Sequence, residues 1–262
     1  MTAIKDIILY LDTIAPPEQK DEVDNIGLMV GSTQRLVSKA ILCLDVTKDV
    51  IKEAKDVSAQ LIISHHPFIF RPISNITDQT LLGSKILDVI KNDISVFSAH
   101  TNLDSSEQGI NAYIAELLEL KNIKRFDIED SEWQGGRIGD LPKILTVKEL
   151  ADKLQKILKD DTLRTVGSVE KEVKKVAFIS GGAGKTEYLN AAISQNADCY
   201  ISADFMHHVM LEAYEKDFAL IICSHYYMER VILSRLKKML EKVFCDVEFV
   251  LSKTEKNPVN SL

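Results

Sequence analysis

Two adjacent histidines, His65 and His66, are the residues of this chain whose types and spacing point most directly to chemistry. They stand at the end of the apolar run LIISHHPFIF (61–70), directly before Pro67. Imidazole nitrogens bind metals and transfer protons near neutral pH, so an apolar strand that ends on two of them is typical of a site. Because the chain turns where a strand ends, the two side chains can serve two different metals, or two sides of one.

Two further groups pair a histidine with a carboxylate four residues later. They are His100 with Asp104 in HTNLD, and His225 with Glu229 in HYYMER. If the turn is helical, the imidazole and the carboxylate share one face, which is metal-ligand spacing. Structural roles are the alternatives: Asp104 or its neighbour can cap a helix over 108–120, and Glu229 can favour the dipole of its own helix.

A fourth group, SADFMHH, contains Asp204, His207 and His208 and also follows an expected strand. We expect it to line a pocket, because the other groups already supply enough ligands for two metals. Mixed histidine and carboxylate ligation without cysteine suits Zn, Mn or Fe better than Mg or Ca. Two such ions would share a bridging carboxylate and a bridging water, and that water becomes a hydroxide nucleophile near neutral pH.

The segment ISGGAGKTEYL (179–189) contains GKT but does not match a Walker phosphate-binding loop. That pattern needs a glycine five residues before Gly184, and the position holds Ile179. We therefore expect a tight turn between a strand and a helix, whose amides can still bind an anion.

Composition bounds the class of protein. The 262 residues are 45% apolar and 27% charged, which is enough for a well-buried core in one large domain or two small ones. A net charge of −7 without a basic block argues against broad binding to nucleic acids.

Four scattered cysteines without C-x-x-C are expected to be mostly buried thiols. The acidic, amphipathic N-terminus is unlike a signal peptide, and no apolar run reaches the roughly 18–20 residues that span a bilayer, so we expect a cytoplasmic enzyme or binding protein.

The elements that must position these residues alternate between strands and helices. In the first half we expect strands at 38–46, 60–66 and 94–100 and helices at 47–57, 77–92 and 108–120. In the second half we expect helices at 146–158, 185–196, 207–214 and 227–242, with strands at 163–168, 174–180, 199–202, 218–225 and 245–252. Such alternation predicts βαβ units in a mostly parallel sheet. Ligands bind outside the carboxyl ends of such strands, where His65, His66 and His100 stand.

A polar stretch, 121–145, interrupts the alternation and contains the only tryptophan. We place a lobe boundary there. The predicted organisation is an N-terminal α/β lobe over 1–124, a second α/β lobe over 125–217, and a C-terminal strand-helix-strand over 218–262 that returns to complete the metal site.

Three local predictions concern chain ends and caps. Thr2 is expected to cap a first helix, and Thr146 with Glu149 has the spacing of a capping box. The tail TEKNPVNSL, residues 254–262, is expected to fray.

Together these motifs resemble those of the GTP cyclohydrolase 1 type 2 homologue family, also called Nif-three-like proteins. The stretches that carry the resemblance are DNIGLMVG, SHHP, AHTNLD, GGRIGDL, SADFMHH and SHYYMER, and they span nearly the whole chain. The sequence departs from the family pattern at Val23, Ala203 and Ser224, where a tryptophan and two glycines are usual. These positions affect backbone geometry and substrate fit and are not proposed ligands.

The resemblance implies a two-lobed α/β Nif-three-like fold with a dinuclear site between the lobes, and a ring-shaped homohexamer, a trimer of dimers. The ligands that carry over to this sequence are His65, His66, Asp104, His225 and Glu229. Glu229 is implied to bridge both divalent ions, His66 and Asp104 to complete one, and His65 and His225 to complete the other.

The implied activity is hydrolytic opening of the guanine ring of GTP by a metal-bound hydroxide, with release of formate. His100 is implied to stand beside the metals as a supporting or proton-transfer group, so His100 and Glu229 are the catalytic candidates. Two alternatives stay open: a dinuclear metal phosphoesterase acting on a nucleotide or phosphorylated metabolite, and a non-catalytic metal-binding interaction protein.

Overall fold

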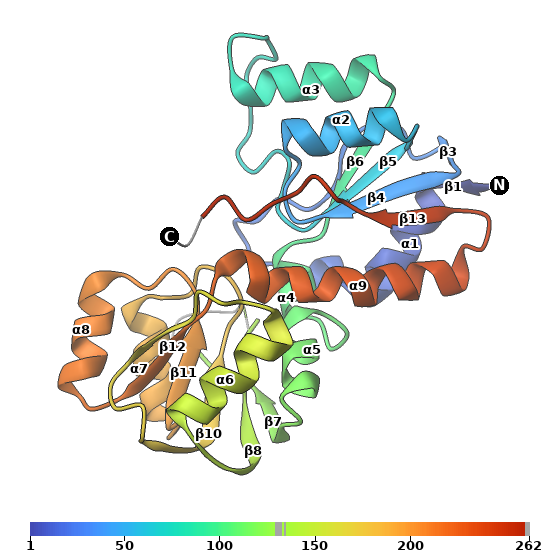
Figure 1. Ribbon diagram of the computed structural model, residues 1–262. Helices are drawn as coiled ribbons and strands as arrows, with labels where there is room; N and C mark the ends of the chain where they lie inside the picture. The colour runs from blue at the N-terminus through green and yellow to red at the C-terminus, as the bar shows by residue number, and fades with distance from the viewer. Residues whose placement is uncertain (129–132, 134, 260–262) are drawn as a thin grey trace. The chain divides into compact units, whose positions relative to one another are not determined.

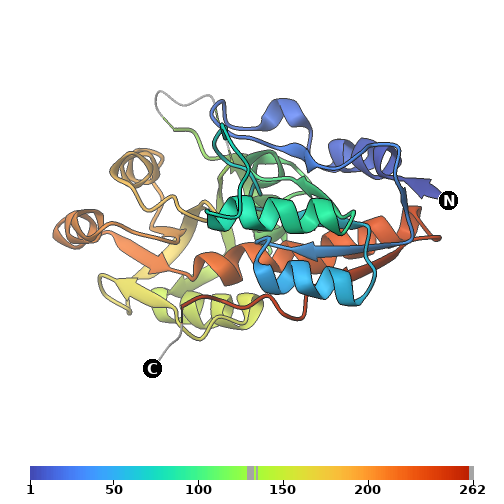
Figure 2. The same ribbon diagram turned by 90° about the horizontal axis from the view of Figure 1, so that it is seen from above.

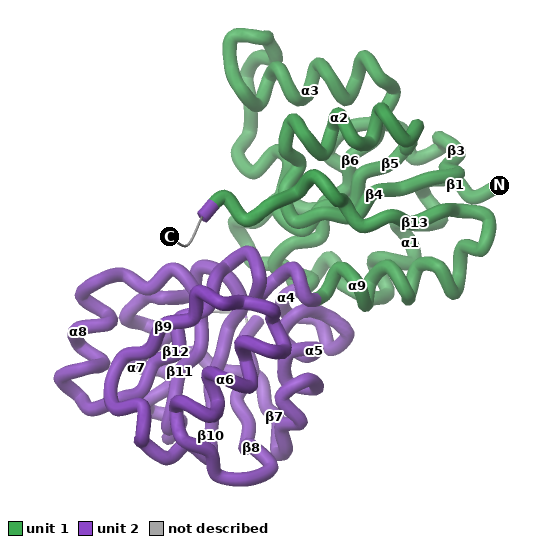
Figure 3. Tube along the Cα trace, viewed as in Figure 1, with its two compact units in different colours: residues 1–103, 232–258 green, residues 104–231, 259–262 purple. Residues whose placement is uncertain are grey.

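The computed structural model describes residues 1–128, 133 and 135–259 and shows an α/β chain that divides into two compact units (Figures 1 and 3). The first unit comprises residues 1–103 and 232–258, and the second comprises residues 104–231 and continues from residue 259. The chain passes between units inside α4 (Thr101–Ser105) and inside α9 (His225–Val243). The alternating α/β class predicted from the sequence is confirmed, whereas the predicted lobe limits stay a prediction.

The first unit is built on a five-stranded sheet of order β13-β4-β5-β6-β2. These strands are β13 (Glu248–Leu251), β4 (Lys39–Cys43), β5 (Leu61–Ser64), β6 (Ser95–Ser98) and β2 (Gly27–Val30). The first four run parallel, as expected for βαβ units, and only β2 is antiparallel to its neighbour. A separate short ladder joins β1 (Thr2–Ala3) to β3 (Leu36–Val37).

Helices cover both faces of this sheet (Figures 1 and 2). The helices α2 (Lys48–Asp56) and α3 (Leu81–Lys91) lie side by side on one face, and α1 (Ile4–Ile14) lies on the other. A short 3-10 turn, Pro17–Gln19, follows α1. The apolar faces of α2 and α3 pack on alternate strand residues such as Ile41 and Ile62, which are fully buried. The strands read as continuous apolar runs because both of their faces are covered.

The register of the parallel strands brings the candidate residues to one edge. Cys43 pairs with Ser64, and Ser64 pairs with Ser98. The residues that follow these three positions therefore leave the sheet at the same edge, as the sequence predicted for the histidines.

The second unit is built on a six-stranded sheet of order β7-β8-β10-β11-β12-β9. These strands are β7 (Lys121–Arg125), β8 (Arg137–Thr146), β10 (Glu172–Phe178), β11 (Cys199–Ser202), β12 (Ala219–Ile222) and β9 (Arg164–Val166). Only β10, β11 and β12 are parallel to one another, so this sheet is mixed. The helices α7 (Thr186–Ser194) and α8 (His207–Glu215) lie on one face and α6 (Val147–Leu158) on the other (Figure 2), while α5 (Ile110–Leu117) precedes β7.

The polar stretch 121–145 is the clearest difference from the sequence prediction. It contains β7 and most of β8, which pair with each other at the sheet edge. Four of the five β7 residues are exposed, so this edge strand lacks the apolar run from which a strand is predicted, and the lobe boundary placed here stays a prediction.

Two predictions about chain ends were wrong. Thr2 does not cap α1: it pairs with Val37 in a strand, and its hydroxyl donates to Asp246 at 2.6 Å. The start of the tail does not fray, because Thr254 donates to Glu53 and Glu255 is only 7% exposed, while residues 260–262 of the predicted tail lie outside the described residues.

Other local predictions were correct. Both hydrogen bonds of the Thr146–Glu149 capping box are present at the start of α6. Cys43, Cys199 and Cys223 are buried thiols, and Cys245 is exposed. Within the described part of the chain, no helix combines the length and the apolar character needed to span a bilayer.

Candidate metal centre

Three imidazoles of the first unit, His65, His66 and His100, form one cluster. Their ring centroids are 5.0 Å apart for His65 and His66, 5.1 Å for His65 and His100, and 5.7 Å for His66 and His100. One ring nitrogen of each lies within 4.8 Å of the others, which is close enough to share one ion or to serve adjacent ions. His65 is buried, and the other two are partly buried.

Each of these imidazoles is held through its Nδ1 atom. His65 Nδ1 lies 2.9 Å from the carbonyl oxygen of Ala99, His66 Nδ1 lies 2.9 Å from Asp45 Oδ1, and His100 Nδ1 lies 2.9 Å from Asp24 Oδ1. A carbonyl oxygen only accepts, so His65 carries its proton on Nδ1, and ionised carboxylates favour the same tautomer. Nε2 then carries the lone pair of each ring and can bind an ion or accept a proton, and metal-binding histidines commonly show this arrangement.

Asp24, which precedes the glycine-bracketed strand β2, is a buried carboxylate that anchors His100. Burial raises the pKa of Asp24, but hydrogen bonds and charge attraction from His100 and hydrogen bonds from Thr101 outweigh burial and lower that pKa to about 2. The carboxylate is therefore ionised near neutral pH and holds the proton of His100 on Nδ1.

In the second unit, His225 and Glu229 form a direct pair. The helix α9 begins at His225, so the two residues share a face, as their spacing predicted. His225 Nε2 lies 3.0 Å from Glu229 Oε2, and His225 Nδ1 lies 2.6 Å from Asp204 Oδ2. Asp204 therefore holds the His225 ring through Nδ1, as Asp45 holds the His66 ring.

The sheet register explains this second convergence. The strands β10, β11 and β12 are parallel, with Phe178 paired to Ile201 and Ser202 paired to Ile222. The chain therefore delivers Gly181, Asp204 and His225 to one edge of the sheet. Gly181 has φ +74°, and a Cβ there would lie 2.3 Å from Glu229 Oε1. The glycine turn predicted from GGAGKT thus makes room for the carboxylate of Glu229.

Asp104 is the second carboxylate among the candidate ligands, and it lies in the second unit close to Glu229. One carboxylate oxygen of each lies within 4.8 Å of the other. Ser180 donates to Asp104 Oδ1 at 2.9 Å, and the amide of Asn111 donates to Ser180 Oγ at 3.0 Å. The alternative of a helix cap is wrong, because the N-cap of α5 is Gly109.

Arg137, the arginine of GGRIGDL, fixes the segment after Asp104. Its guanidinium is buried and donates to the carbonyl oxygens of Gly135, Gly136, Ser105 and Ser106 at 2.8–3.2 Å. Burial lowers the pKa of Arg137, and the charge of Glu107 opposes that shift. Arg137 therefore has a structural role: it ties the strand β8 to the loop that follows α4.

His207 and His208 are exposed at the start of α8. Among the described residues, no metal-capable cluster includes either histidine. The residue of SADFMHH that reaches a candidate ligand is Asp204, and pocket lining by the two histidines stays a prediction.

The donor sets fit a transition metal. The first unit offers three imidazoles, and the second offers one imidazole with the carboxylates of Asp104 and Glu229. Nitrogen and carboxylate donors without thiolate match Zn, Mn or Fe. Asp104 and Glu229 are 5% and 2% exposed, and close carboxylates of this kind are stabilised when a cation lies between them.

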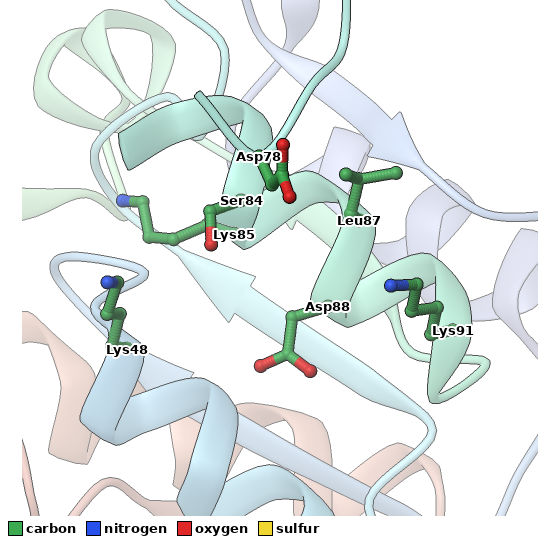
Figure 4. A pocket seen from close by; sticks show the side chains of 7 residues that line it. All are labelled: Lys48, Asp78, Ser84, Lys85, Leu87, Asp88 and Lys91. Atoms are coloured by element: carbon green, nitrogen blue, oxygen red, sulfur yellow. The ribbon is translucent and has the colours of Figure 1, made fainter. Parts of the chain in front are cut away.

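A separate pocket of about 330 Å³ lies between α2 and α3 in the first unit (Figure 4). Its lining includes Lys48, Lys85 and Lys91 together with Asp78 and Asp88. Asp88 also pairs with Lys55 at 3.3 Å, and the lining as a whole has one more lysine than aspartates.

Lys85 links this pocket to the segments around His66. Its ammonium donates to the carbonyl oxygen of Val46 at 2.7 Å and lies 5.3 Å from the ring centre of Phe68. Val46 follows Asp45, the partner of His66, and Phe68 stands two residues after His66.

Sequence reasoning did not single out Asp24 or Asp45, and it expected Asp204 to line a pocket and not to hold His225. Asp24 begins DNIGLMVG, Asp45 stands near the end of the strand expected at 38–46, and Asp204 lies in SADFMHH. A polar residue at the end of a predicted strand was the available signal, because such ends meet at one sheet edge.

Comparisons with known proteins match nearly the whole chain. The model of a family described as Duf34/NIF3 (NGG1p interacting factor 3) matches residues 2–258. A Clostridium perfringens protein named GTP cyclohydrolase 1 type 2 homolog is 38% identical over 258 residues, which is 97% of this chain and 98% of the relative.

Solved structures show the same fold. A structure described as reduced HcgD from Methanocaldococcus jannaschii is 30% identical, with a TM-score of 0.85 and coverage of 96% of this chain and 98% of that one. The Staphylococcus aureus hypothetical protein SA1388 is 25% identical, with a TM-score of 0.88 and coverage of 99% of both chains.

Proposed function

Because the chain belongs to the Duf34/NIF3 (NGG1p interacting factor 3) family, we propose that it is a dinuclear metal-dependent hydrolase that opens the guanine ring of GTP and releases formate. The observation that carries the proposal is the set of imidazoles oriented through Nδ1, together with two close buried carboxylates. The Clostridium perfringens relative supports the choice of substrate, since its name is GTP cyclohydrolase 1 type 2 homolog.

We assign two divalent ions, Zn, Mn or Fe, to the ligands His65, His66, Asp104, His225 and Glu229. These five side chains would hold the ions, and Glu229 would be the carboxylate that both ions could share. When bound, such ions lower the pKa of a coordinated water so that it can act as a nucleophile near neutral pH.

His100 is the proposed proton-transfer group. Asp24, with its pKa of about 2, keeps the proton of the imidazole on Nδ1. Nε2 is then the atom that accepts a proton and returns it to a leaving group. The fixed ring orientation keeps this atom in place through the cycle.

A metal phosphoesterase is the second candidate, and the lysine-lined pocket favours it. Lys48, Lys85 and Lys91 would attract a phosphate-bearing substrate, and Lys85 contacts Val46 and Phe68, which follow Asp45 and His66 in the chain. GTP also carries phosphates, so the pocket is compatible with both activities and the products distinguish them.

The test is to load the purified chain with each metal and to measure metal content, formate and phosphate with GTP as substrate. Formate supports ring opening, phosphate without formate supports the phosphoesterase, and metal binding without turnover on a nucleotide panel supports a non-catalytic metal-binding protein. Glu229→Gln is expected to abolish turnover. Glu241→Gln is the matched control, since Glu241 lies on the same helix in an exposed pair with Lys237 at 2.8 Å.

Assembly as a homohexamer is also proposed. The loop and helix start after the paired histidines expose several large apolar side chains: Phe70 at 40%, Ile73 at 40%, Ile76 at 44% and Leu81 at 64%. Such side chains gain stability when another subunit covers them. Light scattering should give six times the chain mass, and Ile76→Glu should reduce it. A cytoplasmic location stays a prediction of the sequence.

A further inference from the structure

The segment after β13 is docked against the first unit by two buried carboxylates, Glu53 and Glu255. The backbone amide of Ser252 donates to the carbonyl oxygen of Leu42 at 2.9 Å, which continues the pairing of β13 with β4. Ser252 Oγ then accepts the backbone N–H of Glu255 at 3.1 Å. This turn directs Glu255 inward, where it is 7% exposed.

Glu255 binds the backbone just after β4, at Leu44 and Asp45, the two residues that support His66. Its Oε1 atom accepts the backbone N–H of Leu44 at 2.6 Å and that of Asp45 at 2.8 Å. Hydrogen bonds to a carboxylate are stronger than those between neutral groups, and a low-dielectric surrounding strengthens them further. The two consecutive peptide groups are therefore held in one orientation.

Leu44 and Asp45 in turn hold His66 at two points. The carbonyl oxygen of Leu44 accepts the backbone N–H of His66 at 2.9 Å, and Asp45 Oδ1 lies 2.9 Å from His66 Nδ1. The backbone and the ring of His66 thus depend on the same two residues whose amides Glu255 binds.

We infer that Glu255 is a positioning residue for His66, acting through Leu44 and Asp45 to aim the Nε2 atom of the imidazole at its ion. The inference rests on the proposed metal site. Without the Glu255 carboxylate, the backbone N–H groups of Leu44 and Asp45 lose their hydrogen-bond acceptor. The Asp45 side chain is then held less firmly in the orientation that binds the His66 ring. Outer partners of metal-binding histidines contribute about 10–100-fold to affinity, and for one acting through a second residue we expect about 10-fold.

Glu53 provides a control that separates this role from anchoring of the tail. Its carboxylate accepts from Ser252 Oγ at 2.7 Å, from the amide of Lys253 at 3.0 Å and from Thr254 Oγ1 at 2.8 Å. It therefore anchors the same segment and is similarly buried, at 9% exposed. The Glu53 carboxylate binds the tail at Ser252, Lys253 and Thr254, whereas Glu255 binds the amides of Leu44 and Asp45.

The experiment measures Zn²⁺ affinity, by competition with a chromophoric chelator, and the visible spectrum after Co²⁺ substitution, using the full chain. Glu255→Gln should bind one of two ions about 10-fold more weakly and should shift the cobalt bands. Glu53→Gln should lower thermal stability while leaving affinity and spectrum as in the wild type. In the double variant with Asp45→Asn, the loss should be less than the product of the single losses, since both act on the same ring.

Three results would overturn the inference: wild-type affinity in Glu255→Gln, equal losses in Glu255→Gln and Glu53→Gln, or fully independent losses in the double variant. If Glu255→Gln does not fold, Glu255→Asp keeps the charge with a shorter reach and is expected to show the same spectral shift. Failure of the wild-type chain to bind metal is a different result, because it removes the proposed function itself.

Discussion

Replacing Gly181 with alanine is expected to displace Glu229 while leaving the rest of the second unit in place. A Cβ at this position would lie 2.3 Å from Glu229 Oε1 and 3.5 Å from His225 Cε1. The first distance is far inside van der Waals contact, so one partner must move. Oε1 is the end of a flexible side chain, and we therefore expect the carboxylate to rotate away from His225 while the backbone stays.

Two separate effects follow. Gly181 has φ +74°, where a side chain costs roughly 1–2 kcal/mol, so the free energy of unfolding of the metal-free protein should fall by about that amount. Loss of Glu229 as a ligand should weaken metal binding by at least the roughly 10–100-fold that loss of an outer partner causes. The drop in affinity should thus exceed what the loss of stability explains.

Gly182→Ala is the matched control in the neighbouring position. A Cβ there would meet only Asp204 Oδ2, at 3.7 Å, which is an ordinary contact. Urea unfolding of the metal-free variants and zinc competition titrations measure the two effects separately. Equal metal affinity in the two variants would refute the claim that Gly181 makes room for Glu229.

Further predictions concern stability. Thr146→Ala removes one half of the capping box of α6 and should lower the free energy of unfolding by about 1 kcal/mol, measured in urea. Arg137→Lys should cost about 2–3 kcal/mol in the same assay because an ammonium cannot serve four carbonyl oxygens, whereas Arg125→Lys, on a half-buried arginine that pairs with Glu107, should cost about 0–1 kcal/mol. Burial raises the pKa of Glu53, but hydrogen bonds from the tail outweigh it and lower that pKa, so its stabilisation is present above the ordinary value and is lost as pH falls. The urea midpoint should therefore fall more steeply from about pH 5 to about pH 3 in the wild type than in Glu53→Gln, and parallel curves would contradict this.

The sequence predicted the parts of the fold that depend on local pattern. Apolar runs and helical periodicity placed most helices and strands, and the capping box set the start of α6. The gathering of His65, His66 and His100 was also predictable, because parallel strands align their carboxyl ends. The contact between His225 and Glu229 was predictable from their spacing of four residues, because a helical turn puts both side chains on one face.

Contacts between distant segments were not predictable in this way. The hydrogen bond between Asp24 and His100 joins residues 76 positions apart, and that between Glu255 and Leu44 joins residues 211 positions apart. Neither the periodicity nor the spacing of residues in the sequence reveals such pairs, since they depend on which segments the sheet places side by side. The edge strand β7 was missed for a related reason: its pairing with β8 is visible only in the folded chain, and its exposed side chains lack a pattern.

The four imidazoles are oriented by oxygen atoms of the protein, so folding should precede metal binding. Each Nδ1 atom is held by an oxygen from a different segment of the same unit: Ala99, Asp45, Asp24 and Asp204. Ring orientation is therefore set by strand register, which forms with the hydrophobic core and needs no ion. Each unit should thus present its Nε2 atoms before metal arrives, and the ion then stabilises the folded chain by mass action, in proportion to the logarithm of its concentration over the dissociation constant. This differs from small zinc domains, which are unfolded without their metal because they lack a core of this size.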